Sequence, residues 1–182
     1  MFSGFFTIGR SYHSQMGWFR KTSERDSLGV AMAGVKLGDR FLSLGLRDPR
    51  LIAALAAKAG LTGTACAIET DAAGAQEGAA AVEAEGALVD ATHAPWDALP
   101  YAAASFDVVL VRDVFSTQEP DLKARCAAEV LRVLRGGGRV LVIESLKAKS
   151  DSVTPLKNAG FAAVRVLAEA EGASFVEGLK KA

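Results

Sequence analysis

The sequence predicts an α/β protein in which helices cover both faces of a mostly parallel β-sheet. Short apolar runs that suit buried strands alternate with longer segments of helical periodicity. Near the end of the chain two strand-like runs follow each other directly, which indicates an antiparallel hairpin. The 182 residues, half of them apolar, suit one compact domain. Parallel strands that are joined through helices by right-handed crossovers form a doubly wound sheet.

The first predicted strand, residues 41–46, is an apolar run with Gly45 near its carboxyl end. Nucleotide-type ligands bind at this end of the strands in open α/β sheets. Asp48 is the predicted N-cap of the next helix, Pro49 takes the first helical position, and Gly60 ends the helix. The turn between this strand and helix is therefore the first candidate for a ligand site.

The remaining elements follow from periodicity, β-branched content and helix stop signals. Further strands are predicted at residues 64–69, 87–91, 106–111 and 139–144, helices at 72–84, 121–134 and 155–160, and hairpin strands at 161–169 and 173–181. Thr70 or Asp71 is expected to cap the helix that begins at residue 72. Three glycines at 136–138 are expected to end the helix before the strand at 139–144.

Composition excludes several classes of function. Acidic and basic residues balance at 21 each, so no global field favours a nucleic acid partner. Cys66 and Cys126 lie far apart and suit reduced core thiols, and no cluster of residues has the spacing of a metal site. No apolar run approaches the ~20 residues that cross a bilayer. We therefore expect a cytoplasmic protein, with contact to a membrane surface as the alternative.

Three sequence blocks carry a family resemblance. Residues 99–115 (LPYAAASFDVVLVRDVF), 129–145 (EVLRVLRGGGRVLVIES) and 158–180 resemble the class I S-adenosylmethionine-dependent methyltransferases, especially the small type 11 family of the quinone-methylase kind. The resemblance covers roughly residues 35–180. It implies a Rossmann-like methyltransferase fold with a mostly parallel seven-stranded sheet that ends in an antiparallel hairpin. It also implies S-adenosylmethionine as the cofactor.

The cofactor loop departs from the family pattern of an acid in the strand followed by two or three glycines. Ser43 stands where the acid is expected, Gly45 alone is retained, and Leu46 and Arg47 occupy the turn. A turn with side chains gives the cofactor less room to approach the backbone. The negative charge of Asp48 and the proline that follows it disfavour a pyrophosphate at this helix start, which favours S-adenosylmethionine over a dinucleotide.

Seven residues are predicted to bind the cofactor. Glu69, 24 positions after Gly45, suits the two hydroxyls of a ribose, and its alternative is a solvated charge before a helix. By resemblance, Asp90 receives the adenine amino group, although a turn aspartate is an equal alternative. Arg47 suits the methionine carboxylate, or it pairs with a neighbouring acid. The full predicted set is Gly45, Arg47, Glu69, Thr70, Asp90, Ala91 and Arg112.

The catalytic candidates are Tyr12, His13 and Asp113. The first two lie in an N-terminal segment that often closes over the site in this family, and ordinary packing or exposure is the alternative. Asp113 follows the strand at 106–111 together with Arg112, and the two residues also suit a simple ion pair. His93 is no stronger a candidate.

The chain divides into an N-terminal helical arm or lid, residues 1–35, and a methyltransferase-like domain, residues 36–182. Residues 1–21 are aromatic and basic, which suits docking on the domain, a membrane surface, another protein or a transit peptide. The leading hypothesis is a methyltransferase that acts on a small or lipid-like acceptor. The alternatives are a catalytically degenerate binding or assembly subunit and, with least support, an NAD-dependent reductase.

Overall fold

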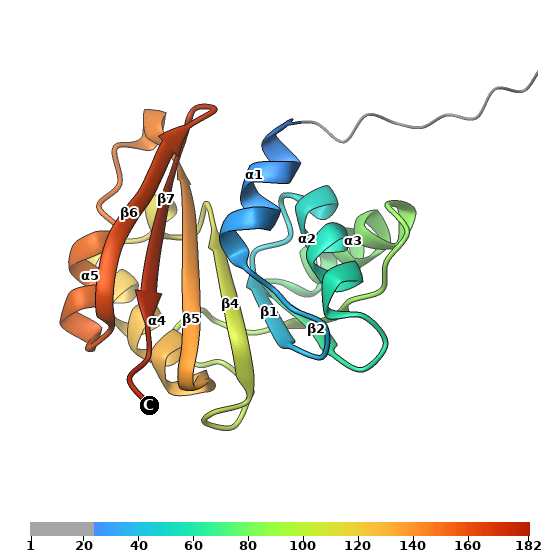
Figure 1. The fold of residues 1–182 in the computed structure, drawn as a ribbon, viewed down its shortest axis with the longest axis horizontal. Coiled ribbons are helices and arrows are strands. Elements are labelled where there is room, and N and C mark those ends of the chain that lie inside the picture. Colours follow the sequence, from blue (N-terminus) through green and yellow to red (C-terminus); the bar gives the residue numbers. More distant parts are fainter. Residues whose placement is uncertain (1–23) are drawn as a thin grey trace, which may run out of the picture.

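The computed structural model describes residues 24–182, and it contains one seven-stranded sheet with helices on both faces (Figure 1). The helices are α1 (Glu24–Ala33), α2 (Pro49–Ala59), α3 (Ala72–Ala84), α4 (Pro120–Val133) and α5 (Val153–Ala159). The strands are β1 (Arg40–Leu44), β2 (Thr64–Glu69), β3 (Asp90–His93), β4 (Phe106–Arg112), β5 (Leu134–Ser145), β6 (Ala162–Ala170) and β7 (Ala173–Leu179). Two short 3₁₀ helices, η1 (Phe115–Thr117) and η2 (Leu146–Ala148), follow β4 and β5. No helix among the described residues is long and apolar enough to span a membrane.

The order of the strands confirms the predicted fold class. The sheet runs β3-β2-β1-β4-β5-β7-β6, with parallel pairing from β3 to β5. β7 lies antiparallel between β5 and β6, so the chain ends in the predicted hairpin. The chain winds outward from β1 to β3 and then returns to place β4 beside β1. Loops therefore diverge at the carboxyl ends of β1 and β4, which is where this type of sheet binds ligands.

Alternate side chains of the central strands point to opposite faces of the sheet and belong to two separate hydrophobic cores. Phe41 and Leu110 face α1, α2 and α3, whereas Leu42 and Val109 face α4 and α5. These side chains are almost wholly buried. A strand that is covered on both faces needs apolar residues at every position, which explains the continuous apolar runs in the sequence.

The caps of α2 and α3 agree with the sequence. Asp48 accepts a hydrogen bond from the Leu51 amide at 3.1 Å, and Pro49 begins the helix. Asp71, rather than Thr70, caps α3 by accepting from the Gly74 amide at 2.7 Å. Each cap satisfies an amide that the first helical turn leaves without a partner.

Two element boundaries are wrong in the sequence prediction. The third strand is not 87–91 but Asp90–His93, because Gly86 (φ +95°) and the bond from the Ala87 amide to Val82 O still close α3. The three glycines at 136–138 are not a helix stop but part of β5, where Gly137 N donates to Lys180 O at 3.0 Å. On the other side of β5, Gly138 permits the close approach of β4, since an added Cβ would lie 3.0 Å from Asp107 O.

The arm predicted at residues 1–35 is described only from residue 24, and Tyr12 and His13 lie outside the described residues. α1 packs on α2 and β5, and Ala33 and Val35 are buried in the core. Arg139 Nη2 donates to Met32 O at 2.8 Å. The division at residue 35 stays a prediction, although apolar side chains from Leu28 to Val35 join the core on this face of the sheet.

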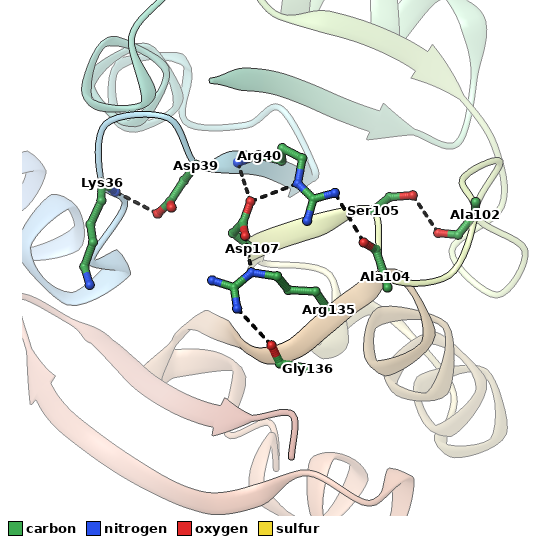
Figure 2. A network of polar contacts seen from close by, with 9 residues as sticks. All are labelled: Lys36, Asp39, Arg40, Ala102, Ala104, Ser105, Asp107, Arg135 and Gly136. Atoms are coloured by element: carbon green, nitrogen blue, oxygen red, sulfur yellow. Dashed lines mark hydrogen bonds and ion pairs between the residues drawn. The ribbon is translucent and has the colours of Figure 1, made fainter. Parts of the chain in front are cut away.

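A polar network joins three strands at the amino edge of the sheet (Figure 2). Asp107 accepts hydrogen bonds from Arg40 N at 2.8 Å and Arg40 Nε at 3.0 Å, and also from Arg135 Nε. Arg135 Nη1 in turn donates to Gly136 O at 2.8 Å. One carboxylate thus ties the starts of β1, β4 and β5, at the edge opposite the carboxyl ends.

Candidate cofactor site

A cavity of about 440 Å³ lies at the carboxyl edge of the sheet. Its lining includes Gly45 and Arg47 after β1, Glu69 and Thr70 after β2, His93 at the end of β3, and Arg112 and Asp113 at the end of β4. The volume suits a small-molecule site. The fold has therefore gathered side chains from four strands at the point where its connections diverge.

The turn after β1 is held tightly by its own backbone. Gly45 has φ +89° and donates its amide to Ile68 O at 3.0 Å. An added Cβ would lie 3.0 Å from Arg112 O, so only glycine fits without a shift. Ser43, in the place of the family acid, is fully buried and donates its hydroxyl to Gly45 O at 2.8 Å. The retained glycine and the substituted serine together fix the shape of the turn.

Leu46 does not obstruct the cavity, although its position in the turn suggested that it could. Its side chain is 5% exposed and packs against α3. An added Cβ at Gly78 would lie 2.5 Å from Leu46 Cβ, so Gly78 leaves the space that Leu46 fills. The sequence change from glycine to leucine in the turn is thus matched by a glycine in the facing helix.

Glu69 lies at the carboxyl end of β2, as predicted, and faces the turn. Its Oε1 accepts a hydrogen bond from the Leu46 amide at 2.6 Å. Arg47 is exposed at the cavity and forms no hydrogen bond or ion pair with the described residues. The predicted residues Gly45, Arg47, Glu69, Thr70, Arg112 and Asp113 are therefore brought together around one cavity.

Asp90 and Ala91 are not at this cavity. Because β3 begins at Asp90 instead of ending near it, both residues lie toward the opposite end of the strand, in a separate hollow of about 540 Å³ along α3. The residue at the carboxyl end of β3 is His93, which pairs with Glu69 in the register. The cavity lining does not include Asp90, so its contact with an adenine stays a prediction, and His93 is the residue of β3 that lines the cavity.

Arg112 is held by two carboxylates. Its Nη2 lies 3.0 Å from Asp48 Oδ2, and its Nε lies 3.9 Å from Asp113 Oδ2. Asp113 adopts φ +52° and accepts a hydrogen bond from the Ser145 amide at 3.2 Å. The ion pair considered from the sequence is present, with Asp48 as the closer partner. Arg112 and Asp113 also line a smaller cavity of about 190 Å³ between β4, β5 and the β6–β7 turn.

Glu144 supports the wall of the cavity and was missed in the sequence. Its carboxylate is only 2% exposed and accepts hydrogen bonds from the amides of Phe115 at 2.8 Å and Ser116 at 3.1 Å. Burial raises the pKa of Glu144, and the hydrogen bonds from Ser116 and Phe115 oppose that rise. The sequence shows only that Glu144 directly follows an apolar strand. It does not show that the carboxylate accepts hydrogen bonds from the amides of Phe115 and Ser116.

The side chains at the cavity carry both signs of charge. Glu69, Asp97 and Asp113 supply carboxylates, whereas Arg47 and Arg112 supply guanidinium groups. Asp97 is paired with Arg125 at 2.9 Å. Among residues 24–182 no group of three or more metal-ligating side chains is close enough to hold an ion. The arrangement can accept hydrogen bonds from hydroxyls, attract a cation and bind a carboxylate.

Comparisons with known proteins agree with this fold and site. The model of the methyltransferase domain family matches residues 42–142. No curated protein matches the chain. A structure of an S-adenosylmethionine-dependent methyltransferase from Aquifex aeolicus is 18% identical with a TM-score of 0.72, and the match covers 85% of this chain and 88% of that one. A protein from Bacillus halodurans is 14% identical with a TM-score of 0.70, over 87% of this chain and 100% of that one.

The same fold also occurs in a protein that is named as a cyclase. The [4+2]-cyclase SpnF is 16% identical with a TM-score of 0.65, over 87% of this chain and 80% of that one. Identities this low show a shared fold, while the family match spans more than half of the 182 residues. The chain therefore belongs to the methyltransferase domain family of type 11, within the class I S-adenosylmethionine-dependent methyltransferases.

Proposed function

We propose that this protein binds S-adenosylmethionine in the cavity at the carboxyl edge and transfers its methyl group to a small or lipid-like acceptor. The observation that carries the proposal is the carboxylate of Glu69, which lies at the end of β2 beside the Gly45 turn. An acid in this place binds ribose hydroxyls in related nucleotide-binding sheets. The family of the chain supports the same cofactor.

The residues present fit the cofactor. One oxygen of Glu69 is occupied by the Leu46 amide, which leaves Oε2 to accept a hydrogen bond from a ribose hydroxyl. Gly45 keeps side-chain atoms out of the space beside the turn. Asp48 occupies the Leu51 amide at the start of α2, so the helix start is poorly suited to a phosphate and well suited to a cofactor without one.

Arg47 supports the fit at the other end of the cofactor. Its guanidinium is exposed at the cavity without a charged partner among the described residues, and a charge-assisted bond to the methionine carboxylate satisfies it. The bound cofactor supplies an electrophilic methyl group on a positively charged sulfur. The chain contributes mainly by holding donor and acceptor in line.

Asp113 is the catalytic candidate that the structure describes. The Ser145 amide holds its carboxylate at the end of β4, where Asp113 lines both the cavity of about 440 Å³ and the one of about 190 Å³. From there it can orient an acceptor or take its proton. Tyr12 and His13 remain candidates in an N-terminal segment that we propose closes over the cavity.

The alternative is a binding or assembly subunit that has lost turnover. Ser43 in place of the family acid and Arg47 in place of a glycine favour it. The likeness to the [4+2]-cyclase SpnF shows only that one fold can host different activities. Binding of the cofactor distinguishes the two proposals before any acceptor is known.

Calorimetric titration with S-adenosylmethionine and its demethylated product tests the proposal. Glu69→Gln keeps an oxygen for the Leu46 amide but loses the charge, and we expect about tenfold weaker binding. Glu83→Gln, which changes an exposed acid on α3, is the matched control and should bind like the wild type. Unchanged affinity in Glu69→Gln would leave that residue a structural role only. No binding by the wild type at millimolar cofactor would favour the subunit without turnover.

A further inference from the structure

Three leucines project into solvent from loops that precede parallel strands, at the edge opposite the cavity, and two of them lie on adjacent loops. The third, Leu88 before β3, is 76% exposed. Leu37, in the loop before β1, is 78% exposed, and Leu61, in the loop before β2, is 106% exposed. Large aliphatic side chains gain most from burial, so two of them on adjacent loops suggest a surface that meets an apolar phase.

The two leucines lie side by side. β1 and β2 are parallel neighbours in which Arg40 pairs with Thr64, and each leucine precedes its strand by three residues. Hydrogen bonds between the loops, such as Gly38 N to Ala59 O at 2.9 Å, hold them together. An added Cβ at Gly60 would lie 2.6 Å from Leu37 Cδ1, which places Leu37 directly over the loop that carries Leu61.

Unpaired positive charge flanks the leucines. Lys36 precedes Leu37 and Lys58 precedes the second loop, and neither ammonium forms an ion pair with the described residues. At the same edge Arg40 and Arg135 share the carboxylate of Asp107, and Asp39 supplies a second acid (Figure 2). Counted with Lys36 and Lys58, the basic side chains at this edge still outnumber the two carboxylates.

A second pair of arginines also shares one carboxylate, but it lies away from this edge, where Glu177 pairs with Leu141 inside the sheet. Arg139 and Arg165 share the carboxylate of Glu177, at 2.5 and 2.9 Å. The chain as a whole has no net charge, so the surplus at Lys36, Lys58, Arg40 and Arg135 is a local property of the edge.

We propose that this amino edge, comprising Leu37 and Leu61 with Lys36, Lys58, Arg40 and Arg135, docks on a membrane surface that contains anionic lipids. Leucines on protruding loops suit insertion among acyl chains, and the basic side chains suit anionic headgroups. A second copy of the chain is disfavoured as the occupant because two positively charged edges repel each other. The cavity, at the opposite edge, faces away from the membrane in this arrangement.

Sedimentation of the full-length protein with vesicles tests the proposal. We expect binding to phosphatidylcholine vesicles that contain phosphatidylglycerol, little binding to phosphatidylcholine alone, and weaker binding at high salt. Leu37→Ser combined with Leu61→Ser should lower the partition coefficient at least about tenfold. Lys36→Gln and Lys58→Gln should each lower it about fivefold.

Leu146→Ser, at an exposed leucine beyond β5 at the opposite edge, is the matched control and should partition like the wild type. Thermal midpoints should stay equal, since the leucines are exposed, and cofactor affinity should be unchanged because the cavity is remote. No binding to anionic vesicles would overturn the proposal. Binding that persists in the double leucine variant would assign the contact to residues 1–23 and would also overturn it. Dimerisation without lipid that the leucine changes abolish would overturn it as well, because the surface would then belong to a second copy.

Discussion

At the scale of single residues, Asp107 is where charge and burial compete most clearly. Burial would raise the pKa of this carboxyl, but hydrogen bonds from Arg40 and Arg135 outweigh burial and lower it to about 2. A carboxylate whose pKa is lower in the folded state than in the unfolded state stabilises the fold above the unfolded pKa. That contribution disappears as the pH falls toward the folded pKa.

We therefore expect Asp107→Asn to lower the free energy of unfolding by about 1–2 kcal/mol at neutral pH, a range that allows for solvent screening of the two half-exposed arginines. The difference from wild type should shrink between about pH 4 and pH 2, because the wild-type carboxylate becomes protonated there. Urea unfolding over a series of pH values measures this. Glu77→Gln on the exposed face of α3 is the control. A difference that stays constant down to about pH 2 would contradict the assignment.

Arg47 gives a second prediction at this scale. Arg47→Gly restores a family-like turn, yet we expect it to weaken the binding of S-adenosylmethionine about tenfold because it removes a charged partner of the methionine carboxylate. Titration of the wild type and the variant side by side measures the effect. Arg50→Gly, at an exposed arginine of α2 that pairs with Glu85 away from the cavity, is the control. Tighter binding in Arg47→Gly would show instead that the guanidinium obstructs the site.

The sequence predicted the positions of individual residues well where a strand end defined them. Gly45, Glu69 and Arg112 each lie at the carboxyl end of an apolar run, and all three line the cavity. The position of Asp90 within β3 was not predictable, because the start of β3 depends on how α3 closes at Gly86, which is a matter of backbone geometry. The sequence also did not show which way the Leu46 side chain points. Its place against α3 depends on the space left by Gly78, which lies 32 positions further along the chain.

At the scale of elements, the spacing between α3 and the turn after β1 depends on one glycine. Gly78 faces Leu46 so closely that an added Cβ would overlap it, at 2.5 Å from Leu46 Cβ. Alanine is otherwise the better helix former by about 1 kcal/mol. The Cβ of Leu46 is fixed to the backbone, so it can move only if the turn after β1 moves with it. The Leu46 amide in that turn donates a hydrogen bond to Glu69.

Gly78→Ala should therefore lower the free energy of unfolding by about 1–3 kcal/mol and also weaken cofactor binding. Gly74→Ala in the same helix is the matched control, because its added Cβ would meet only carboxylate atoms of Asp71, the nearest at 3.1 Å, and no backbone-anchored Cβ. It should be close to neutral. Urea unfolding and calorimetric titration of both variants measure the two effects. Equal stability of the two variants would show that α3 shifts freely.

Elements were predictable to the extent that local signals define them. The caps Asp48 and Asp71 mark the starts of α2 and α3, and short apolar runs mark the central strands. The prediction from the glycines at 136–138 was wrong because glycine occurs both at helix ends and at close contacts between strands. Only the pairing with the chain at β7 distinguishes the two cases, and the sequence does not show that pairing.

At the scale of the whole molecule, α1 belongs to the core that packs on β1 and β5. Gly29 lets the helix approach Leu51, since an added Cβ would lie 3.0 Å from Leu51 Cδ1 and 3.8 Å from Ile143 Cδ1. Ala33 and Val35 are buried there, in the same cluster. The sequence suggested a boundary at residue 35 because the first clear strand begins soon afterwards. From the burial of Ala33 and Val35 we predict a stable unit that begins further toward the N-terminus.

Two truncations locate that boundary. Removing residues 1–23 should change the free energy of unfolding by less than about 0.5 kcal/mol, as for a change outside the core. Removing residues 1–35 should lower it by about 3 kcal/mol or more, because Leu51 and Ile143, which α1 buries, would become exposed to solvent. Urea unfolding measures both. If the arm closes over the cavity, the shorter truncation should also release cofactor faster in stopped-flow experiments. A chain without residues 1–23 that cannot fold would show that their aromatic side chains are core, and the proposed lid would then be wrong.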